Sequence, residues 1–219
     1  MRFIKLWAWR QQVYGANSGY MGGGGWTVLL ARIMIDGIES GDLLLGNGGA
    51  SVGNVLNFFF KTAAVLPQPW SAKLWQGTNC KQEEEDTNRD KGWIKVLAPV
   101  SKGNFGRNTT RSTQSNTALA VIQAAAAIGK GAHWTSLLTP LHVPSALRQF
   151  SAVIVVELWT RGTAVSGSSA PVLAEMKAAV SSKLIWLTVE LEKVCSTSVR
   201  LYPRSIRRKK NDDSSRGFM

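Results

Sequence analysis

The sequence predicts an α+β fold in which a mostly helical region precedes a truncated ferredoxin-like domain. Apolar residues recur at helical spacing through residues 1–76, and glycines and prolines separate the predicted helices. After Gly92 strands and helices alternate, in the order that begins a ferredoxin-like unit. The predicted organisation is a helical domain at 1–76, an acidic loop or insert at 77–92, a truncated ferredoxin-like domain at 93–203 and a basic tail at 204–219.

The first predicted helix has Lys5 and Arg10 on its polar side. Tyr14 is expected to close its last turn, because Gly15 follows and glycine commonly ends helices. Four consecutive glycines, residues 22–25, then form a turn before the next helix. Glycine carries no Cβ, so this turn would let a ligand approach the backbone closely.

Two further helices complete the helical region. Residues 27–35 are apolar apart from Arg32, as expected for a buried helix. Residues 52–65 direct apolar side chains toward a core at helical spacing. This helix must end before Pro67 and Pro69, because proline cannot continue a helix.

The second region begins with a predicted strand at 93–100 and a polar turn at 103–113. Ser112 or Thr113 is expected to cap a helix that runs through residues 118–128. For Ser112, we prefer this capping role to a functional one.

Three more elements are predicted further along the chain. Residues 146–160 contain a β-rich run, residues 171–194 form a long amphipathic helix, and residues 198–202 read as a short strand.

The charge of the chain favours a polyanion as partner. Lysines and arginines number 26 against 14 acidic residues, which gives a net charge of +12. Residues 93–156 contain no acidic residue, and we expect Lys102, Arg107 and Arg111 in this stretch to contact an RNA backbone. Such contacts release counterions and make binding salt-dependent. The alternative is a protein whose surface is merely basic.

The basic tail has two open interpretations. It is either a solvated, disordered end or a nuclear import signal, built from Arg204, Arg207, Arg208, Lys209 and Lys210.

The cysteines and histidines predict no metal site. Cys80 and Cys195 lie far apart, near no partner motif, and indicate unpaired thiols in a reducing compartment. His133 and His142 form no metal-ligand spacing with either cysteine. No secretory segment and no apolar run of about 18 residues is present, so we expect a soluble intracellular protein without a membrane partner.

The start of the chain resembles the central domain of eukaryotic poly(A) polymerases. In that family a lysine, a tyrosine nine residues later and a Gly-Gly pair before a tryptophan face ATP; here they are Lys5, Tyr14, Gly22, Gly23 and Trp26. Later stretches are also similar to the family: an asparagine and a Ser-Thr pair before a helix, and an aromatic strand that ends in Thr-Arg-Gly. The matching residues are Asn108, Ser112, Thr113, Thr160, Arg161 and Gly162.

The resemblance implies ATP as substrate, bound by Lys5, Tyr14, Gly22 and Gly23. It also implies an RRM-like RNA-binding domain and a role in mRNA polyadenylation in the nucleus. RNA is then the expected partner, together with a catalytic nucleotidyltransferase part or other RNA-processing proteins. Two residues are candidates for a contact to the base, namely Asn17 and Thr113.

The chain departs from the family in its carboxylates. A nucleotidyltransferase holds magnesium with acids spaced one residue apart behind a Gly-Ser loop. The acidic run at 83–86 has no such loop ahead of it and reads as a solvated loop, while Asp36 and Asp42 lie beyond the motif. Because the motif begins so close to Met1, we expect the catalytic domain, and with it Mg²⁺, to be missing from this chain. No catalytic residue is therefore assigned.

Two further departures concern the base contact and the sheet. The asparagine that follows the family's tyrosine by two residues falls on Ala16, with Asn17 one place off. The family's RNA-binding domain continues with further strands, so a sheet cut short here would expose an edge.

Three hypotheses follow. The chain is a truncated or split poly(A) polymerase, or a degenerate paralogue retained as a non-enzymatic RNA-binding or scaffold protein. The third is a helical interaction domain whose basic charge is incidental, and a salt titration of RNA binding separates it from the other two.

Overall fold

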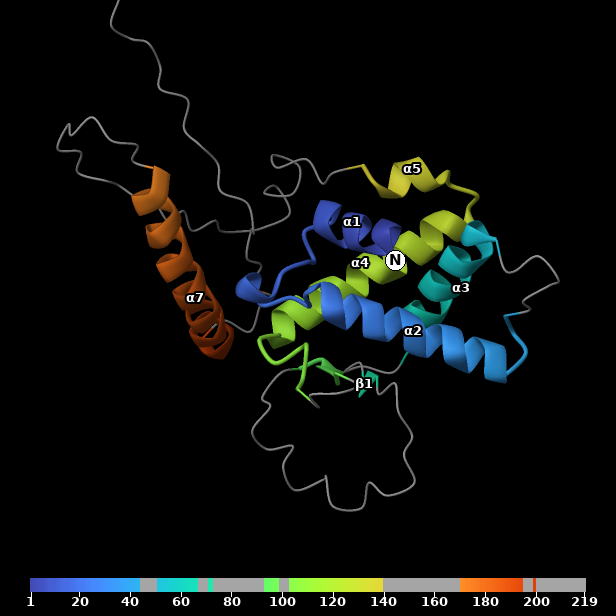
Figure 1. Ribbon diagram of the computed structural model, residues 1–219, viewed down its shortest axis with the longest axis horizontal. Helices are drawn as coiled ribbons and strands as arrows, with labels where there is room; N and C mark the ends of the chain where they lie inside the picture. Colours follow the sequence, from blue (N-terminus) through green and yellow to red (C-terminus); the bar gives the residue numbers. More distant parts are fainter. Residues whose placement is uncertain are drawn as a thin grey trace, which may run out of the picture.

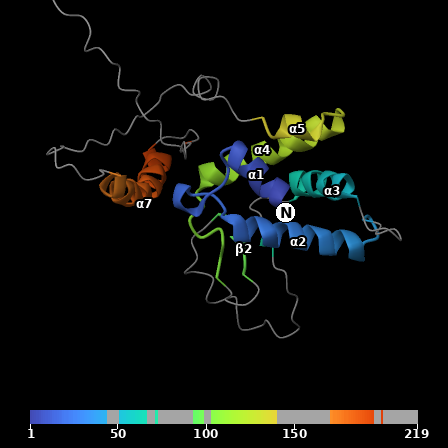
Figure 2. The same ribbon diagram turned by 45° about the horizontal axis from the view of Figure 1, so that its top comes forward.

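The computed structural model describes residues 1–43, 51–66, 71–72, 93–98, 103–139, 170–194 and 199. This part of the chain is mostly helical, and its helices pack around one core with α7 at one side (Figures 1 and 2). The elements are α1 (Arg2–Arg10), the 3₁₀ helix η1 (Ala16–Ser18), α2 (Gly23–Glu39), α3 (Val52–Val65), β1 (Ser71–Ala72), β2 (Lys95–Val96), α4 (Arg111–Gly129), α5 (Trp134–Leu137) and α7 (Ala170–Val194).

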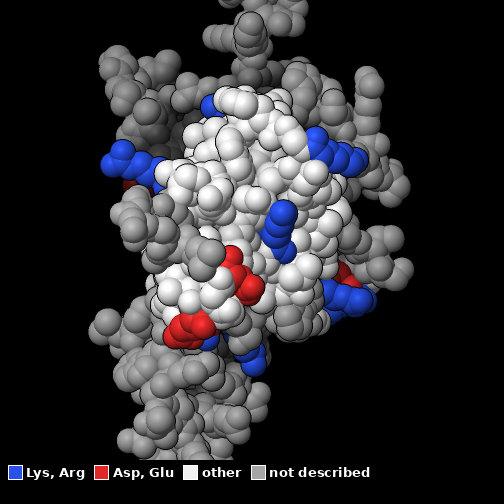
Figure 3. All heavy atoms as spheres, turned by 90° about the vertical axis from the view of Figure 1, so that its right-hand side faces the viewer, with Lys and Arg blue, Asp and Glu red and all other residues white. Residues whose placement is uncertain are grey.

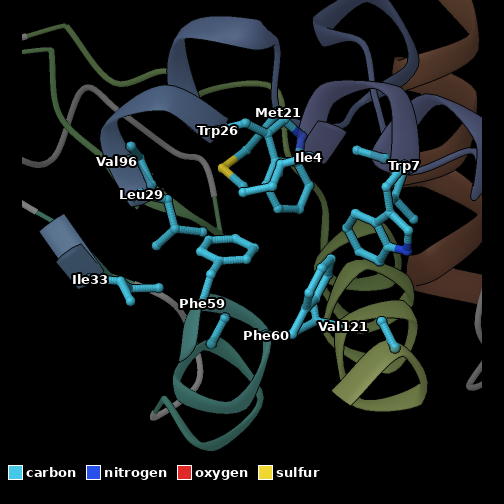
Figure 4. Close-up of a cluster of buried hydrophobic side chains, with 14 of the residues drawn as sticks. Ile4, Trp7, Met21, Trp26, Leu29, Ile33, Phe59, Phe60, Val96 and Val121 are labelled. Carbon is cyan, nitrogen blue, oxygen red and sulfur yellow. The ribbon is translucent and has the colours of Figure 1, made fainter. Parts of the chain in front are cut away.

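Aromatic side chains from α1, α2 and α3 form the centre of the core (Figure 4). Trp7 packs edge-on against Trp26 at 5.8 Å between ring centroids, and against Phe60 at 4.8 Å. Such pairs add about 0.5–1.5 kcal/mol each beyond the burial of their area. Val121 of α4 and Val96 of β2 are fully buried in the same cluster. Residues before and after the acidic run at 83–86 therefore contribute to the same hydrophobic core. The domain boundaries given above remain predictions.

Helix α1 ends earlier than the sequence predicts. The N–H of Val13 donates to the carbonyl of Ala8 and that of Gln12 to Trp9, the pair of bonds that closes a helix in a Schellman motif. Gln12 adopts the required left-handed conformation with a φ of 61°. Tyr14 therefore lies beyond the helix and does not close its last turn.

The helices expected from spacing and proline signals are present. The helix at 52–65 is confirmed with both ends, and the helix expected at 171–194 begins one residue earlier, at Ala170. The helix expected at 27–35 is longer, because α2 already begins within the glycine run.

The cap of α4 is Thr110, so the prediction of Ser112 or Thr113 is wrong. Thr110 is the N-cap: its hydroxyl accepts from the N–H of Thr113, and the Thr113 hydroxyl accepts from the N–H of Thr110 at 2.8 Å. The two side chains form a capping box.

The ferredoxin-like sheet is not confirmed. Among the described residues the strands are β1 and β2, which pair in parallel over two residues each. On the other edge of β2, the N–H groups of Ile94 and Val96 donate to the side chains of Thr109 and Asn104. The polar turn thus occupies the edge that a neighbouring strand would need. The strands expected at 146–160 and 198–202 lie outside the described residues, apart from Val199.

Candidate functional site

Lys5 and Tyr14 meet over the start of α2. A Cβ placed on Gly23 would lie 2.8 Å from the Tyr14 hydroxyl oxygen and 3.2 Å from Nζ of Lys5. Both polar groups therefore approach the backbone of Gly23, while a Cβ on Gly22 would have nothing within 4 Å. Three segments that are separate in sequence converge at this point.

The next two glycines serve packing. A Cβ on Gly24 would lie 2.5 Å from the ring of Phe105, and one on Gly25 would lie 3.1 Å from the Phe105 Cβ and 3.3 Å from the sulfur of Met21. The ring of Phe105 can lie against α2 because these positions carry no side chain. The polar turn at 103–110 is thereby held beside the first turn of the helix.

The electrostatics of the α2 N-terminus favour an anion. Gly22 is the N-cap and provides no side-chain acceptor, and the first turn of α2 contains no acidic residue. The first N–H groups of a helix have no partner within it and form the positive end of the helix dipole. The half-buried Lys5 adds a cation and forms no ion pair with any described residue.

The loop between Tyr14 and Gly22 is compact and braced. Its ends are tied by the N–H of Gly15, which donates to the carbonyl of Met21 at 3.1 Å. At its centre η1 exposes Asn17, and Asn108 of the polar turn donates from Nδ2 to the carbonyl of Ala16 at 3.2 Å. Asn108, which the sequence singled out, therefore fixes the loop that carries Asn17.

Thr113 is placed differently from the other candidate residues. Its side chain is fully buried, and its hydroxyl both accepts from the N–H of Thr110 and donates to the Thr110 carbonyl. Its methyl group lies where a Cβ on Gly19 would come within 3.3 Å. Thr113 thus packs against the loop at Gly19, while Asn17 is exposed to solvent.

Comparison of the sequence with models of known protein families identifies the family of this chain. A model of the poly(A) polymerase central domain matches residues 1–131, which is more than half of the 219 residues. The chain belongs to the poly(A) polymerase family. A comparison with individual curated proteins gave no match.

The basic candidates of this poly(A) polymerase relative lie near the same loop. Arg107 and Arg111 are exposed, on either side of Asn108 and the N-cap of α4. Lys102 lies outside the described residues. On the face of the molecule in Figure 3, the described basic and acidic side chains are dispersed among uncharged ones, and in places a basic side chain lies next to an acidic one.

The acids of the poly(A) polymerase central domain lie away from Gly23. Asp36 pairs with Arg32 on α2, and Asp42 accepts a hydrogen bond from the Ser40 hydroxyl at 2.7 Å. Asp36 is about 20 Å along the helix axis from Gly23 at 1.5 Å per residue. Among the described residues, no group of three or more potential metal ligands lies together, and no helix is long and apolar enough to cross a membrane.

Several structural residues of this site were missed in the sequence. The Thr110–Thr113 spacing is that of a capping box and could have located the true cap. Phe105 gave no signal, because its role depends on glycines that are distant in sequence. The same holds for Glu192 of α7, whose carboxylate accepts hydrogen bonds from Thr110 and Ser112.

The different surroundings of the glycines predict different effects of alanine. Gly24→Ala should lower the free energy of unfolding by about 1–3 kcal/mol, because its Cβ meets a packed ring. Gly23→Ala should stay within about 1 kcal/mol of the parent, because its Cβ meets only the ends of flexible side chains and alanine favours the helix. Chemical denaturation of both variants measures the difference. Equal losses in the two variants would contradict the packing of Phe105 on α2.

Proposed function

We propose that this chain contributes ATP binding and RNA 3′-end binding to mRNA polyadenylation in the nucleus, and that it does not transfer adenylate alone. The observation that carries the proposal is the convergence of Lys5 and Tyr14 on Gly23 at the start of α2. Membership of the poly(A) polymerase family supports ATP and RNA as the substrate class.

The triphosphate is the part of ATP that this geometry suits. Unpaired N–H groups at a helix start bind phosphate oxygens, and the helix dipole adds to the attraction. The Lys5 ammonium and the Tyr14 hydroxyl, which lie beside Gly23, offer further donors. Gly22 leaves its backbone open to a sugar or phosphate, because a Cβ there would have nothing within 4 Å, and Gly23 lets the ends of Lys5 and Tyr14 reach the same place.

The base is proposed to lie toward η1. Asn17 is exposed there and its amide can both donate and accept. The hydroxyl of Thr113 is already engaged in the capping box, which leaves Asn17 as the better candidate of the two. Because Ala16 stands where the family has its asparagine, we expect weak discrimination between adenine and other bases.

Catalysis is assigned to a separate nucleotidyltransferase part as a partner. Adenylyl transfer in this family requires carboxylates that hold magnesium at the triphosphate. In the described part of the chain, Asp36 and Asp42 are engaged elsewhere and do not fit such a metal site. The proposal for this chain therefore contains no metal step.

RNA is proposed to contact the exposed arginines beside the loop. Arg107 and Arg111 flank the turn that Asn108 ties to η1, so a phosphate backbone held there would pass close to the nucleotide. Lys102 is proposed to join them from the same segment.

A second candidate is a degenerate paralogue that binds RNA as a scaffold without ATP. The replacement of the family's asparagine by Ala16 and the position of the acids favour it. RNA binding without ATP binding would support this alternative.

ATP binding tests the nucleotide site. Lys5→Ala should weaken ATP binding by about 10–100-fold, because it removes a charged hydrogen-bond donor. Tyr14→Phe should weaken it by about fivefold, because it removes one neutral hydroxyl. Isothermal calorimetry with the full chain measures both effects.

Lys61→Ala is the matched control, because it removes the same charge from an exposed position on α3. Equal affinity in the parent, Lys5→Ala and Tyr14→Phe would show that these residues are only structural. A parent chain that does not bind ATP would favour the scaffold alternative.

RNA binding is predicted to depend on salt. For single strands the logarithm of the binding constant falls with the logarithm of salt at a slope of about −0.7 per phosphate contact. Arg107→Ala and Arg111→Ala should each reduce that slope by about 0.7, measured with an oligo(A) in a fluorescence titration. Lys130→Ala, at the opposite end of α4, should leave the slope unchanged. A flat salt dependence in the parent would instead favour the interaction-domain hypothesis.

A further inference from the structure

Helix α7 is joined to the first turn of α4 by the carboxylate of Glu192. Oε1 of Glu192 accepts from the Thr110 hydroxyl at 2.6 Å and from the N–H of Ser112 at 2.9 Å. These donors belong to the first turn of α4, where N–H groups lack partners within the helix and a negative charge is favoured. Glu192 is thus a long-range cap of α4, 80 residues from Ser112 in sequence.

The same end of α7 packs against η1. Thr188, one turn before Glu192, is buried, and its hydroxyl donates to the Leu184 carbonyl within α7. Beyond the helix, the N–H of Val199 donates to the Ser112 hydroxyl at 2.9 Å. The chain on both sides of this helix end is therefore fixed to the first turn of α4, with η1 against it (Figure 1).

The position of η1 bears directly on the ATP site. It lies in the loop that begins just after Tyr14 and ends at Gly22, and backbone hydrogen bonds tie this loop to Gly15, the residue next to Tyr14. Ser18 and Tyr20 donate from their N–H groups to the carbonyl of Gly15. Displacement of η1 would therefore move Tyr14 relative to Gly23.

We propose that Glu192 is a positioning residue of the ATP site: by capping α4 it holds α7 against η1 and thereby fixes the loop that carries Tyr14 and Asn17. The part that concerns ATP rests on the proposed function. Glu192 touches no nucleotide itself and acts through α7 and the loop.

Glu190 provides a matched control in the same helix. Its carboxylate pairs with Lys193 at 2.7 Å on the exposed side of α7, so its removal deletes the same charge without touching α4.

Hydrogen exchange of the nucleotide-free full chain tests the bracing of the loop. Glu192→Ala should speed exchange at the amides of Gly15, Ser18 and Tyr20 about tenfold, because hydrogen bonds to a charged acceptor are lost. Glu192→Gln keeps the size and one acceptor oxygen, so we expect a smaller increase of about threefold. Amides within α3 should keep their rates, and Glu190→Ala should resemble the parent.

ATP calorimetry on the same variants tests the effect on the site. Glu192→Ala should weaken ATP binding in parallel with the faster exchange, whereas Glu190→Ala should not. Unchanged exchange in both Glu192 variants, or equal acceleration in α3, would overturn the proposal. Faster loop exchange with unchanged ATP affinity would overturn the link to the site. Because the exchange comparison uses no nucleotide, it decides the bracing role even if the parent chain fails to bind ATP.

Discussion

The arrangement of the molecule depends on the first turn of α2, which consists of glycines. At Gly23 the bare backbone admits the polar ends of Lys5 and Tyr14, and at Gly24 it admits the ring of Phe105. A Cβ at Gly23 would displace the ends of Lys5 and Tyr14, and a Cβ at Gly24 would push back the ring of Phe105. The glycine run therefore unites two requirements, close packing of the polar turn on α2 and an open helix start that favours an anion.

The first turn of α4 is the second point at which distant segments meet. The hydroxyl of each of Thr110 and Thr113 accepts a hydrogen bond from the backbone N–H of the other. Glu192 of α7 adds a carboxylate acceptor at the same place. Asn108, two residues before the cap, reaches back to the loop at Ala16. The loop between Tyr14 and Gly22 is thus held between the start of α2 and the start of α4.

The sequence predicted the elements and contacts that depend on local spacing. The helix at 52–65 follows from its apolar period and the prolines after it, and the meeting of Lys5 and Tyr14 at the glycines follows from the family motif. Other features depend on tertiary context. Gln12 adopts the left-handed conformation that usually indicates glycine, so the sequence did not predict the helix end. Glu192 accepts a hydrogen bond from Ser112, which lies 80 residues away in sequence.

The described strands show why the predicted sheet is not confirmed by the residues around β2. A β-rich run at 93–100 implies neighbours on both edges, but side-chain acceptors of Asn104 and Thr109 satisfy one edge of β2. Hydrophobic alternation reports which residues can form a strand, and it does not report whether a turn already supplies their hydrogen bonds.

The most direct measurement is an amide NMR titration of the ¹⁵N-labelled chain with ATP. We expect the largest shift changes at the amides of Gly23, Gly24 and Gly25, because these N–H groups would donate to the triphosphate at the start of α2. The amide of Asn17 should follow as the base approaches η1. Shift changes confined to other helices, with the glycine amides unmoved, would contradict a nucleotide site at this position.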